Sequence, residues 1–220
     1  MEKMNKKYKL VIFDLDGTLM DTSEGILSAV KYTIDKAGMS ELTEEQMKSF
    51  IGPPIQKSFA NIYGVDEVRA NELASIFRER YSNVELFGAQ PYDGIFELLE
   101  ELAKRQIKTA VATYKREDYA LRLLKKFHFD DYMSIMYGSD MEGRLSKSDI
   151  IRKCIEEANV SFDETAMIGD TRNDEIGAHD LEIDFIGVTY GFGFKCKNDM
   201  GQYHKNIACV DEVRQILKIV

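Results

Sequence analysis

Two aspartates, Asp14 and Asp16, directly follow a short apolar run at residues 10–13. The run contains β-branched residues and is apolar on both faces, which predicts a buried strand. Side chains two apart on an extended chain point the same way, so both carboxylates can face one cleft. Gly17 then allows the chain to turn. Carboxylates paired in this way can serve as a nucleophile and as a general acid or base.

A second pair of acids stands at the end of another expected strand. Residues 165–169 lead directly into Asp170, and Asp174 follows four residues later. Ligands of open parallel sheets bind at the carboxyl ends of the strands, so we expect the two pairs of acids to meet. Asp174 also lies at the start of a predicted helix, where an acidic residue is favoured as a cap. Capping and a role in the site are therefore both open for Asp174.

Four carboxylates that converge on one cleft repel each other unless a cation neutralises them. Hard oxygen donors suit Mg²⁺, which binds through a few carboxylates together with substrate phosphate. We therefore expect Mg²⁺ as the cofactor. The candidate metal residues are Asp14, Asp16, Asp170 and Asp174.

Two further residues at expected element ends fit a phosphate. Thr113 ends the strand predicted at residues 108–113, and its hydroxyl can donate a hydrogen bond to a phosphate oxygen. Lys147 lies just before the helix predicted at residues 148–158, and its ammonium can pair with a phosphate. Taken alone, Thr113 is an ordinary strand former and Lys147 an ordinary surface charge. Their order along the chain and their positions favour the phosphate-binding interpretation.

The elements that must position these residues alternate along the chain. Strands are expected at 10–13, 108–113, 133–137, 165–169, 185–189 and 207–210, and helices at 94–104, 117–127, 148–158, 174–181 and 211–218. Such alternation implies parallel strands joined by crossover helices. The expected fold class is α/β, with a three-layer Rossmann-like parallel sheet as the core.

One stretch, residues 20–88, interrupts this alternation after the first strand. It carries no strand signal, and Thr43 with Gln46 forms a helix capping box inside it. We expect a small helical domain at residues 20–88, inserted into a catalytic core made of residues 1–19 and 89–220.

The composition limits the classes of partner. The chain has 220 residues, and 29 Lys and Arg against 38 Asp and Glu give a net charge of −9. This acidic balance argues against a nucleic acid polymer or an anionic membrane as partner. No apolar run reaches the roughly 18 residues of a membrane span. Residues 1–9 are polar and basic and lack the shape of a signal peptide, so a cytoplasmic location is expected.

The motifs together resemble a known family. Residues 9–19, KLVIFDLDGTL, are similar to the first motif of the haloacid dehalogenase-like superfamily. Thr113, Lys147 and residues 169–174, GDTRND, resemble its second, third and fourth motifs in the right order. The resemblance covers essentially the whole chain, and the helical insertion is similar to the small helical cap of the family.

Two glycine-containing segments add a similarity to the phosphoglycolate-phosphatase-like branch. These are residues 51–54, IGPP, and residues 190–193, YGFG. Gly52 with the prolines after it can be a helix breaker or part of a substrate loop. The later segment can be a flexible loop or a lining of the site. Tyr114 follows Thr113 where relatives commonly carry Asn, and it joins Gly52 as a candidate substrate-binding residue.

The resemblance implies a mechanism. Asp14 would attack phosphorus and become an aspartyl phosphate. Asp16 would protonate the leaving alcohol and then deprotonate the hydrolytic water. Thr113 and Lys147 would grip the phosphoryl oxygens. The implied metal ligands are the Asp14 carboxylate, the Asp16 backbone carbonyl and Asp170, while Asp174 would bind a metal water or orient Lys147.

The expected function is that of a Mg²⁺-dependent phosphatase acting on a small phosphorylated metabolite, with 2-phosphoglycolate as the first candidate. A nucleotidase or pyrophosphatase on the same core is the alternative, and a sugar phosphomutase would carry the same motifs. A dehalogenase is disfavoured, because a second acid at position 16 suits phosphoryl chemistry. A binding module without turnover would have lost a catalytic acid, and none is lost here. The sequence leaves the substrate and the oligomeric state open.

Overall fold

The computed structural model describes residues 8–141 and 144–220. The chain forms two compact units: a core unit of Met1–Met20 with Pro91–Val220, and a helical unit of Asp21–Gln90. The segment at the start of the chain that motivates the cytoplasmic expectation lies largely outside the described residues. No helix in the described part of the chain is long and apolar enough to cross a membrane.

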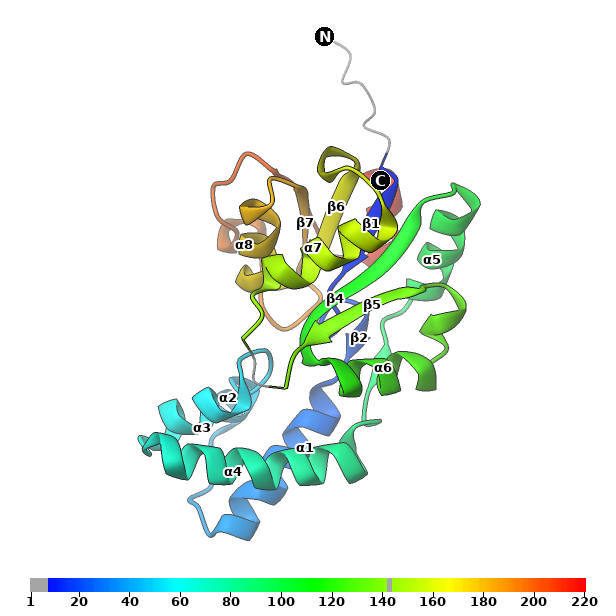
Figure 1. Cartoon of the computed structure of the whole chain (residues 1–220). Helices are drawn as coiled ribbons and strands as arrows, with labels where there is room; N and C mark the ends of the chain where they lie inside the picture. The colour runs from blue at the N-terminus through cyan, green and yellow to red at the C-terminus, as the bar shows by residue number, and fades with distance from the viewer. Residues whose placement is uncertain (1–7, 142–143) are drawn as a thin grey trace. The chain divides into compact units, whose positions relative to one another are not determined.

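Within the described residues, the core unit is built on a six-stranded parallel sheet with the strand order β5-β4-β1-β6-β7-β8 (Figure 1). The strands are β1 (Leu10–Phe13), β4 (Lys108–Arg116), β5 (Ile135–Ser139), β6 (Thr165–Gly169), β7 (Asp184–Val188) and β8 (Asn206–Val210). From β1 the chain first adds β4 and β5 on one side, and then β6, β7 and β8 on the other. This reversal of direction at β1 creates the crevice in which open parallel sheets bind ligands.

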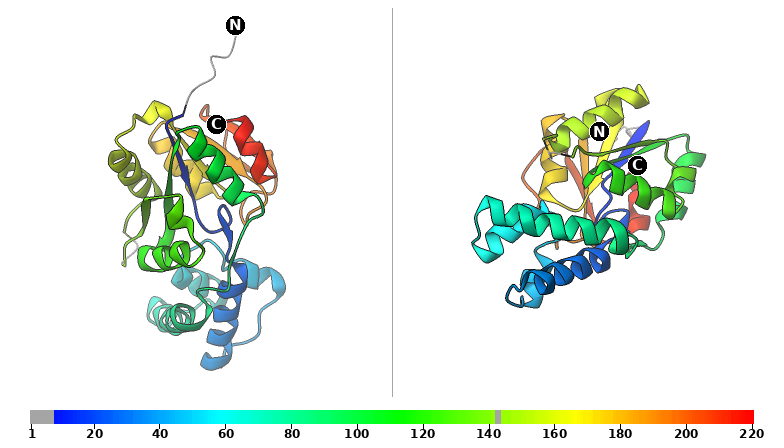
Figure 2. Two further views of the ribbon diagram at one scale, coloured as in Figure 1. Left: turned by 90° about the vertical axis from the view of Figure 1, so that its right-hand side faces the viewer. Right: turned by 60° about the horizontal axis from the view of Figure 1, so that its bottom comes forward.

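Helices cover both faces of this sheet, which confirms the predicted α/β fold class. The α-helices of the core unit are α5 (Ile95–Lys104), α6 (Glu117–Lys126), α7 (Lys147–Ala158) and α8 (Arg172–Asp180). The 3₁₀ helices are η2 (Phe129–Asp131), η3 (Phe162–Glu164), η4 (Lys197–Asp199) and η5 (Val213–Lys218). In the left view of Figure 2, α7 lies on one side of β1, and α5 lies beside η5 on the other.

The prediction of an α-helix at residues 211–218 is wrong in the type of helix and in its first residue. The segment is the 3₁₀ helix η5, which begins two residues later. The side chain of Gln215 bonds back to Asp211, accepting from its backbone N–H and donating to its carboxylate. With the first residues held in this way, only a short segment remains, and short helical segments often take the tighter 3₁₀ form.

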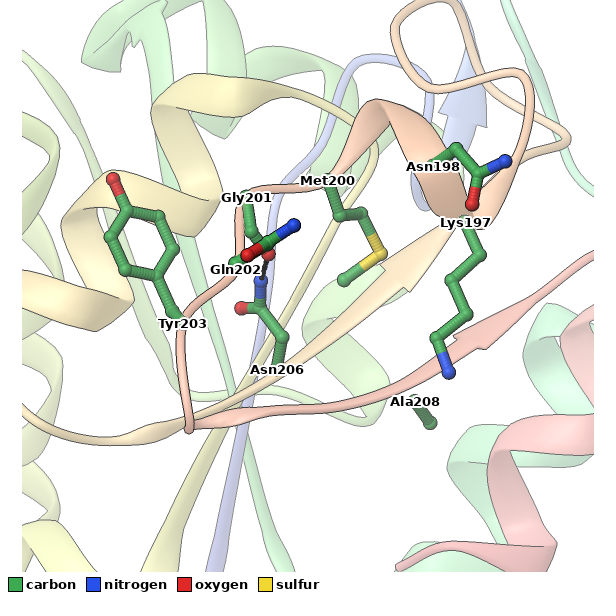
Figure 3. Close-up of a pocket in the computed structure, with 8 residues that line it drawn as sticks. All are labelled: Lys197, Asn198, Met200, Gly201, Gln202, Tyr203, Asn206 and Ala208. Carbon is green, nitrogen blue, oxygen red and sulfur yellow. Dashed lines mark hydrogen bonds between the residues drawn. The ribbon is translucent and has the colours of Figure 1, made fainter.

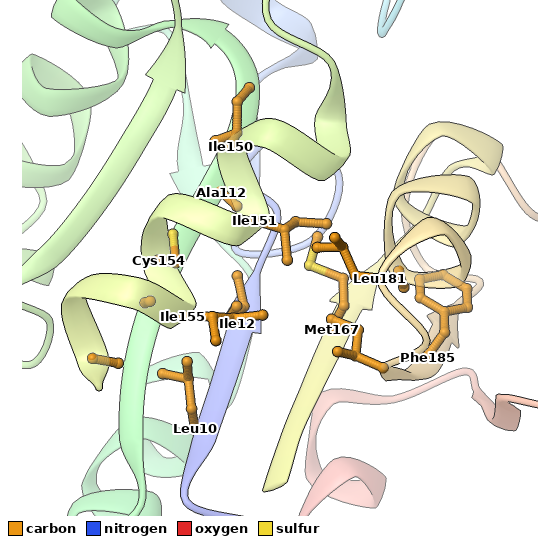
Figure 4. Close-up of a cluster of buried hydrophobic side chains, with 14 of the residues drawn as sticks. Leu10, Ile12, Ala112, Ile150, Ile151, Cys154, Ile155, Met167, Leu181 and Phe185 are labelled. Carbon is orange, nitrogen blue, oxygen red and sulfur yellow. The ribbon is translucent and has the colours of Figure 1, made fainter. Parts of the chain in front are cut away.

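The interior beneath α7 and α8 is a continuous apolar cluster (Figure 4). Leu10 and Ile12 of β1 point into it, while Val11 and Phe13 point to the opposite face and are equally buried. The strand is therefore buried on both faces, as its uniformly apolar sequence predicts. On α7, Ile155 packs into the same cluster. These contacts hold α7, and the residue at its start, against the sheet.

The helical unit contains four α-helices in its described residues: α1 (Ser23–Ala37), α2 (Glu44–Lys48), α3 (Ile55–Tyr63) and α4 (Glu67–Arg80), followed by the π-helical turn η1 (Tyr81–Glu85). The predicted capping box is confirmed, because Gln46 N donates to Thr43 Oγ1 and Thr43 N donates to Gln46 Oε1. The expectation of no strand in residues 20–88 is wrong at its first residues. Two-residue strands, β2 (Met20–Asp21) and β3 (Gln90–Pro91), pair where the chain leaves and re-enters the core unit. Two residues are too few to show an alternating pattern.

Ile155 and Ile176 allow a matched test of this packing. Ile155 on α7 is 1% exposed and Ile176 on α8 is 41% exposed. We expect Ile155→Ala to lower the free energy of unfolding by about 2–5 kcal/mol, because it leaves a cavity in the apolar cluster. Ile176→Ala should change it by no more than about 0.5 kcal/mol. Urea unfolding at equilibrium measures both, and equal losses would contradict the assignment of the core.

Candidate active site

The carboxyl ends of β1 and β6 bring two of the predicted acids together. The strands pair directly, with Phe13 beside Ile168, and Asp14 N donates to Ile168 O at 2.9 Å. The residues that follow, Asp14 and Asp170, therefore leave the sheet side by side. Asp14, Asp170 and Asp174 each offer a carboxylate oxygen, and these oxygens all lie within 4.8 Å of one another. This buried carboxylate cluster is the centre of the candidate active site.

Lys147 supplies the cation within the cluster. Its Nζ lies 2.7 Å from Asp14 Oδ1 and 2.6 Å from Asp174 Oδ1, and its side chain is only 3% exposed. Lys147 is the first residue of α7, one position earlier than the sequence predicts. Ser146 caps the helix, accepting from Asp149 N, and so fixes the point from which Lys147 projects.

Burial and crowding set the charges of the cluster. Burial raises the pKa of Asp14 to about 8; Lys147 opposes this shift, and the neighbouring carboxylates add to it. Burial and then Asp174 raise the pKa of Asp170 to about 7, against the backbone N–H groups that bond it. For Lys147, burial alone would lower the pKa, but Asp14 and Asp174 outweigh it and raise the pKa. Three carboxylates thus face one firmly protonated ammonium.

Asp170 is held by the loop after β7. Its Oδ2 accepts hydrogen bonds from Phe192 N at 2.7 Å and Gly193 N at 3.0 Å, and Thr18 Oγ1 donates to its Oδ1 at 3.4 Å. Gly17, with φ of +84°, packs so closely that a β-carbon there would overlap the Asp170 carboxylate. The YGFG segment, whose role the sequence left open, therefore positions Asp170 through its backbone.

Asp174 caps α8 and also lies in the buried carboxylate cluster, while its role in the reaction stays a prediction. Its Oδ2 accepts from Thr171 N at 3.0 Å and from Thr171 Oγ1 at 2.6 Å, which caps α8. Its Oδ1 pairs with Lys147. The Asp174 carboxylate thus links the N-terminus of α8 to the N-terminus of α7, which holds the two helix N-termini in place relative to each other.

Asp16 is not among the three clustered carboxylates, and its carboxylate contacts a different cation. Its Oδ2 lies 3.0 Å from Lys115 Nζ. Sequence reasoning missed Lys115, because the sequence pattern ended the strand at Thr113, whereas β4 runs on to Arg116.

Thr113 and Tyr114 lie at the carboxyl end of β4, next to β1. Thr113 is buried, and its Oγ1 accepts from Lys115 N at 3.2 Å. The hydroxyl of Tyr114 accepts from Lys147 N at 2.9 Å, so Tyr114 supports the residue that bridges the carboxylates. Direct binding of substrate by Thr113 or Tyr114 stays a prediction.

Gly52 belongs to the helical unit. It lies in the bend between α2 and α3 with φ of +103°, and the next helix begins only after Pro54. The segment therefore does break the helix, because proline cannot continue it and glycine accepts this backbone angle. A role of Gly52 in substrate binding stays a prediction.

Comparisons with known proteins show the family of the chain. Residues 11–188 match the model of the haloacid dehalogenase-like hydrolases. The chain belongs to this family. A 5'-nucleotidase of Pseudomonas aeruginosa is 35% identical over 215 residues, covering 96% of both proteins. A phosphoglycolate phosphatase of Agrobacterium fabrum is 32% identical over 190 residues, covering 83% of this chain and 81% of that protein.

A solved structure supports the same family assignment. A haloacid dehalogenase-like hydrolase of Streptococcus pneumoniae superposes with a TM-score of 0.87 at 28% identity, covering 96% of this chain and 97% of that one. The family match and the phosphatases among the relatives identify the chain as an enzyme, a phosphatase-type haloacid dehalogenase-like hydrolase.

The donor set of this hydrolase fits a hard divalent cation. Every candidate ligand atom in the cluster is a carboxylate oxygen, the donor that Mg²⁺ prefers. When all three carboxylates are ionised, the Lys147 ammonium offsets one negative charge, which leaves two for another cation to balance. Asp14, Asp170 and Asp174 are thus suited to hold a metal ion.

A separate hollow of about 470 Å³ lies on the same unit of the hydrolase (Figure 3). It is lined by Lys197, Asn198, Met200, Gly201, Gln202, Tyr203, Asn206 and Ala208. The buried Glu175 holds its wall, because Gly201 N and Asn206 Nδ2 donate to Glu175 Oε1 at 2.6 and 2.5 Å. None of the candidate catalytic residues lines it, so the hollow is distinct from the carboxylate cluster.

Asp170 should make the metal-free hydrolase less stable as the pH rises. Its pKa is about 7 in the folded chain against an ordinary 3.8, so the folded state binds a proton that the unfolded state has lost between these values. That contribution to stability is complete below about pH 4 and is lost by about pH 7. We expect Asp170→Asn to gain stability relative to wild type across this window and to level off above it.

The measurement is urea unfolding in EDTA at a series of pH values. Asp180→Asn, at the exposed end of α8, is the matched control and should leave the pH dependence unchanged. A constant difference between Asp170→Asn and wild type across pH 4–8 would show that Asp170 is not protonated in the folded, metal-free protein.

Proposed function

We propose that this hydrolase is a Mg²⁺-dependent phosphatase that hydrolyses a small phosphate monoester through a phosphorylated Asp14. The carrying observation is the buried contact of Lys147 Nζ with both Asp14 and Asp174, at 2.7 and 2.6 Å. A carboxylate held at a strand end by a buried ammonium is oriented for attack, and the same ammonium can attract a phosphoryl group.

In the first half-reaction, Asp14 attacks phosphorus. A bond forms between phosphorus and the Asp14 carboxylate as the bond to the leaving oxygen breaks. Asp16 donates its proton to that oxygen, which leaves as an alcohol. Lys147 holds the Asp14 carboxylate and, together with Thr113, binds the phosphoryl oxygens.

In the second half-reaction, water attacks the phosphorus of the phosphorylated Asp14. Asp16, now a carboxylate, takes a proton from this water and is ready for another cycle. The bond between phosphorus and Asp14 breaks, which restores the Asp14 carboxylate and releases inorganic phosphate. Each bond that forms is matched by one that breaks, and the proton that Asp16 loses in the first half-reaction returns in the second.

The metal ligands in this proposal are Asp14, the Asp16 backbone carbonyl, Asp170 and, through water, Asp174. Bound Mg²⁺ supplies positive charge that neutralises the phosphoryl oxygens as charge develops on them. The chain contributes the position of its ligands: Phe192 N and Gly193 N hold Asp170, and Thr171 holds Asp174.

The first candidate substrate is 2-phosphoglycolate. The IGPP and YGFG segments resemble the phosphoglycolate-phosphatase-like branch, and a phosphoglycolate phosphatase is among the relatives at 32% identity. In this proposal the core unit carries out the chemistry, and the helical unit, with Gly52, selects the leaving group. The partner is a small phosphorylated metabolite rather than a nucleic acid polymer or a membrane, and the location is cytoplasmic.

A nucleoside 5'-monophosphate is the second candidate substrate. It is favoured by the 5'-nucleotidase of Pseudomonas aeruginosa, because that relative matches over 96% of both proteins. The two candidates differ in the leaving group, which is a small acid in one case and a nucleoside in the other. Comparison of kcat/KM for 2-phosphoglycolate, AMP and p-nitrophenyl phosphate, with EDTA and with added Mg²⁺, separates them. Turnover that is unaffected by EDTA would contradict the metal dependence.

Asp14→Asn tests the covalent step. Asn keeps the size of the side chain and an oxygen that can face a metal, but it removes the anionic nucleophile. We expect kcat to fall by at least about a thousandfold, because a nucleophile that forms a covalent intermediate has no substitute in the site. Rapid-quench detection of phosphorylated enzyme should give a signal with wild type and none with Asp14→Asn. Activity of the variant near that of wild type would rule out Asp14 as the nucleophile.

A further inference from the structure

Lys115 is a second buried cation in the candidate active site. Its Nζ lies 3.0 Å from Asp16 Oδ2, and the two side chains are only 6% and 18% exposed. A lysine withdrawn from water loses hydration that a surface lysine keeps, so a buried ion pair is weak evidence for stability as such. Its location beside Asp16, the proposed proton donor and acceptor, suggests a role in the reaction.

The backbone around Lys115 directs its side chain toward Asp16. The pairing of β4 with β5 shifts register between Ala112 and Arg116, so the strand bulges at the residues in between. Bulges re-aim side chains and are common beside active sites. Within this bulge, Lys115 N donates to Thr113 Oγ1 at 3.2 Å. The bulge thus links the direction of Lys115 to the candidate phosphate ligand Thr113.

The two carboxylate oxygens of Asp16 are in different situations. Oδ2 is paired with Lys115. Oδ1 is buried and has no hydrogen-bond partner among the described residues. A buried oxygen that the protein leaves unpaired can accept a hydrogen bond from a bound group, and a catalytic role is one explanation for such an atom. One oxygen of Asp16 is thus anchored, while the other is available to a reacting group.

We propose that Lys115 is a positioning residue that anchors Oδ2 of Asp16, so that Oδ1 faces the leaving oxygen in the first half-reaction and the attacking water in the second. This inference rests on the proposed function. The proton travels between Asp16 and the leaving oxygen or water, and Lys115 keeps its own protons throughout. Lys115 therefore acts on the rate only through Asp16.

Because Lys115 acts through Asp16, its loss should affect kcat/KM to a degree that depends on the leaving group. An alkoxide leaves slowly without a proton, whereas p-nitrophenolate leaves readily without one. Loss of Lys115 should therefore lower kcat/KM for ethyl phosphate by about 10–100-fold, part of the effect of a general acid, and much less for p-nitrophenyl phosphate. In an Asp16→Asn background, loss of Lys115 should cost almost nothing further, because residues that act as a unit are not additive.

The experiment is a double-mutant cycle of Lys115→Met and Asp16→Asn, assayed with ethyl phosphate, p-nitrophenyl phosphate and 2-phosphoglycolate and with thermal unfolding of each variant. Lys108→Met is the matched control: Lys108 lies at the other end of β4, where its Nζ donates to Ala158 O at 2.7 Å. Lys108→Met should leave the ratio of kcat/KM for ethyl phosphate to that for p-nitrophenyl phosphate unchanged. Lys115→Arg keeps a cationic donor and should recover part of the loss. If Lys115→Met does not fold, Lys115→Gln replaces it in the cycle.

Three results would overturn the inference. The first is an equal loss on both esters that adds to the effect of Asp16→Asn, which indicates a purely structural lysine. The second is a loss that follows the charge of the leaving group, larger for 2-phosphoglycolate than for ethyl phosphate, which indicates that Lys115 binds the substrate itself. The third is the absence of turnover in the wild type with every ester, which overturns the proposed function along with the inference. Turnover in the wild type separates the first two results from the third.

Discussion

The candidate active site depends on one buried contact, the bridge that Lys147 makes between Asp14 and Asp174. Asp14 follows β1, Lys147 begins α7 and Asp174 lies in the first turn of α8, so the bridge links the end of β1 to the starts of α7 and α8. Without the ammonium, two carboxylates would stand together out of contact with water, which is unfavourable unless they are protonated or paired. The same contact that tolerates this crowding also orients the nucleophile of the proposed reaction.

The sheet topology makes this contact possible. Because β1 lies between β4 and β6, the chain leaves both neighbours at the same edge, and residues distant in sequence meet beside Asp14. The loop after β7 adds its backbone N–H groups to Asp170 without any charged side chain. Lys147 thus holds Asp14 and Asp174, and backbone amides of the loop hold Asp170.

Much of this site could be predicted from the sequence, because Asp14 and Asp170 directly follow apolar strands and their positions depend only on strand order. The contact of Lys115 with Asp16 could not be predicted in the same way. It depends on a bulge in β4, and the sequence pattern placed the end of that strand at Thr113, before Lys115. The hydrogen bonds from the loop after β7 to Asp170 could not be predicted either, because backbone N–H donors do not depend on residue type. Local apolar patterns predict strands well, but they say little about irregular backbone or about short segments such as η5.

The charge balance of the cluster also constrains how substrate can bind. Three carboxylates face one ammonium there, and Asp16 is already paired with Lys115. A phosphate monoester brings further negative charge, so its approach to Asp14 is unfavourable until a cation offsets the carboxylates. In the proposed function, the metal ion must therefore be bound when the phosphate binds, because it neutralises carboxylate charge that would otherwise repel the phosphate. Lys147 alone cannot replace the metal ion, because its single charge is already shared between Asp14 and Asp174.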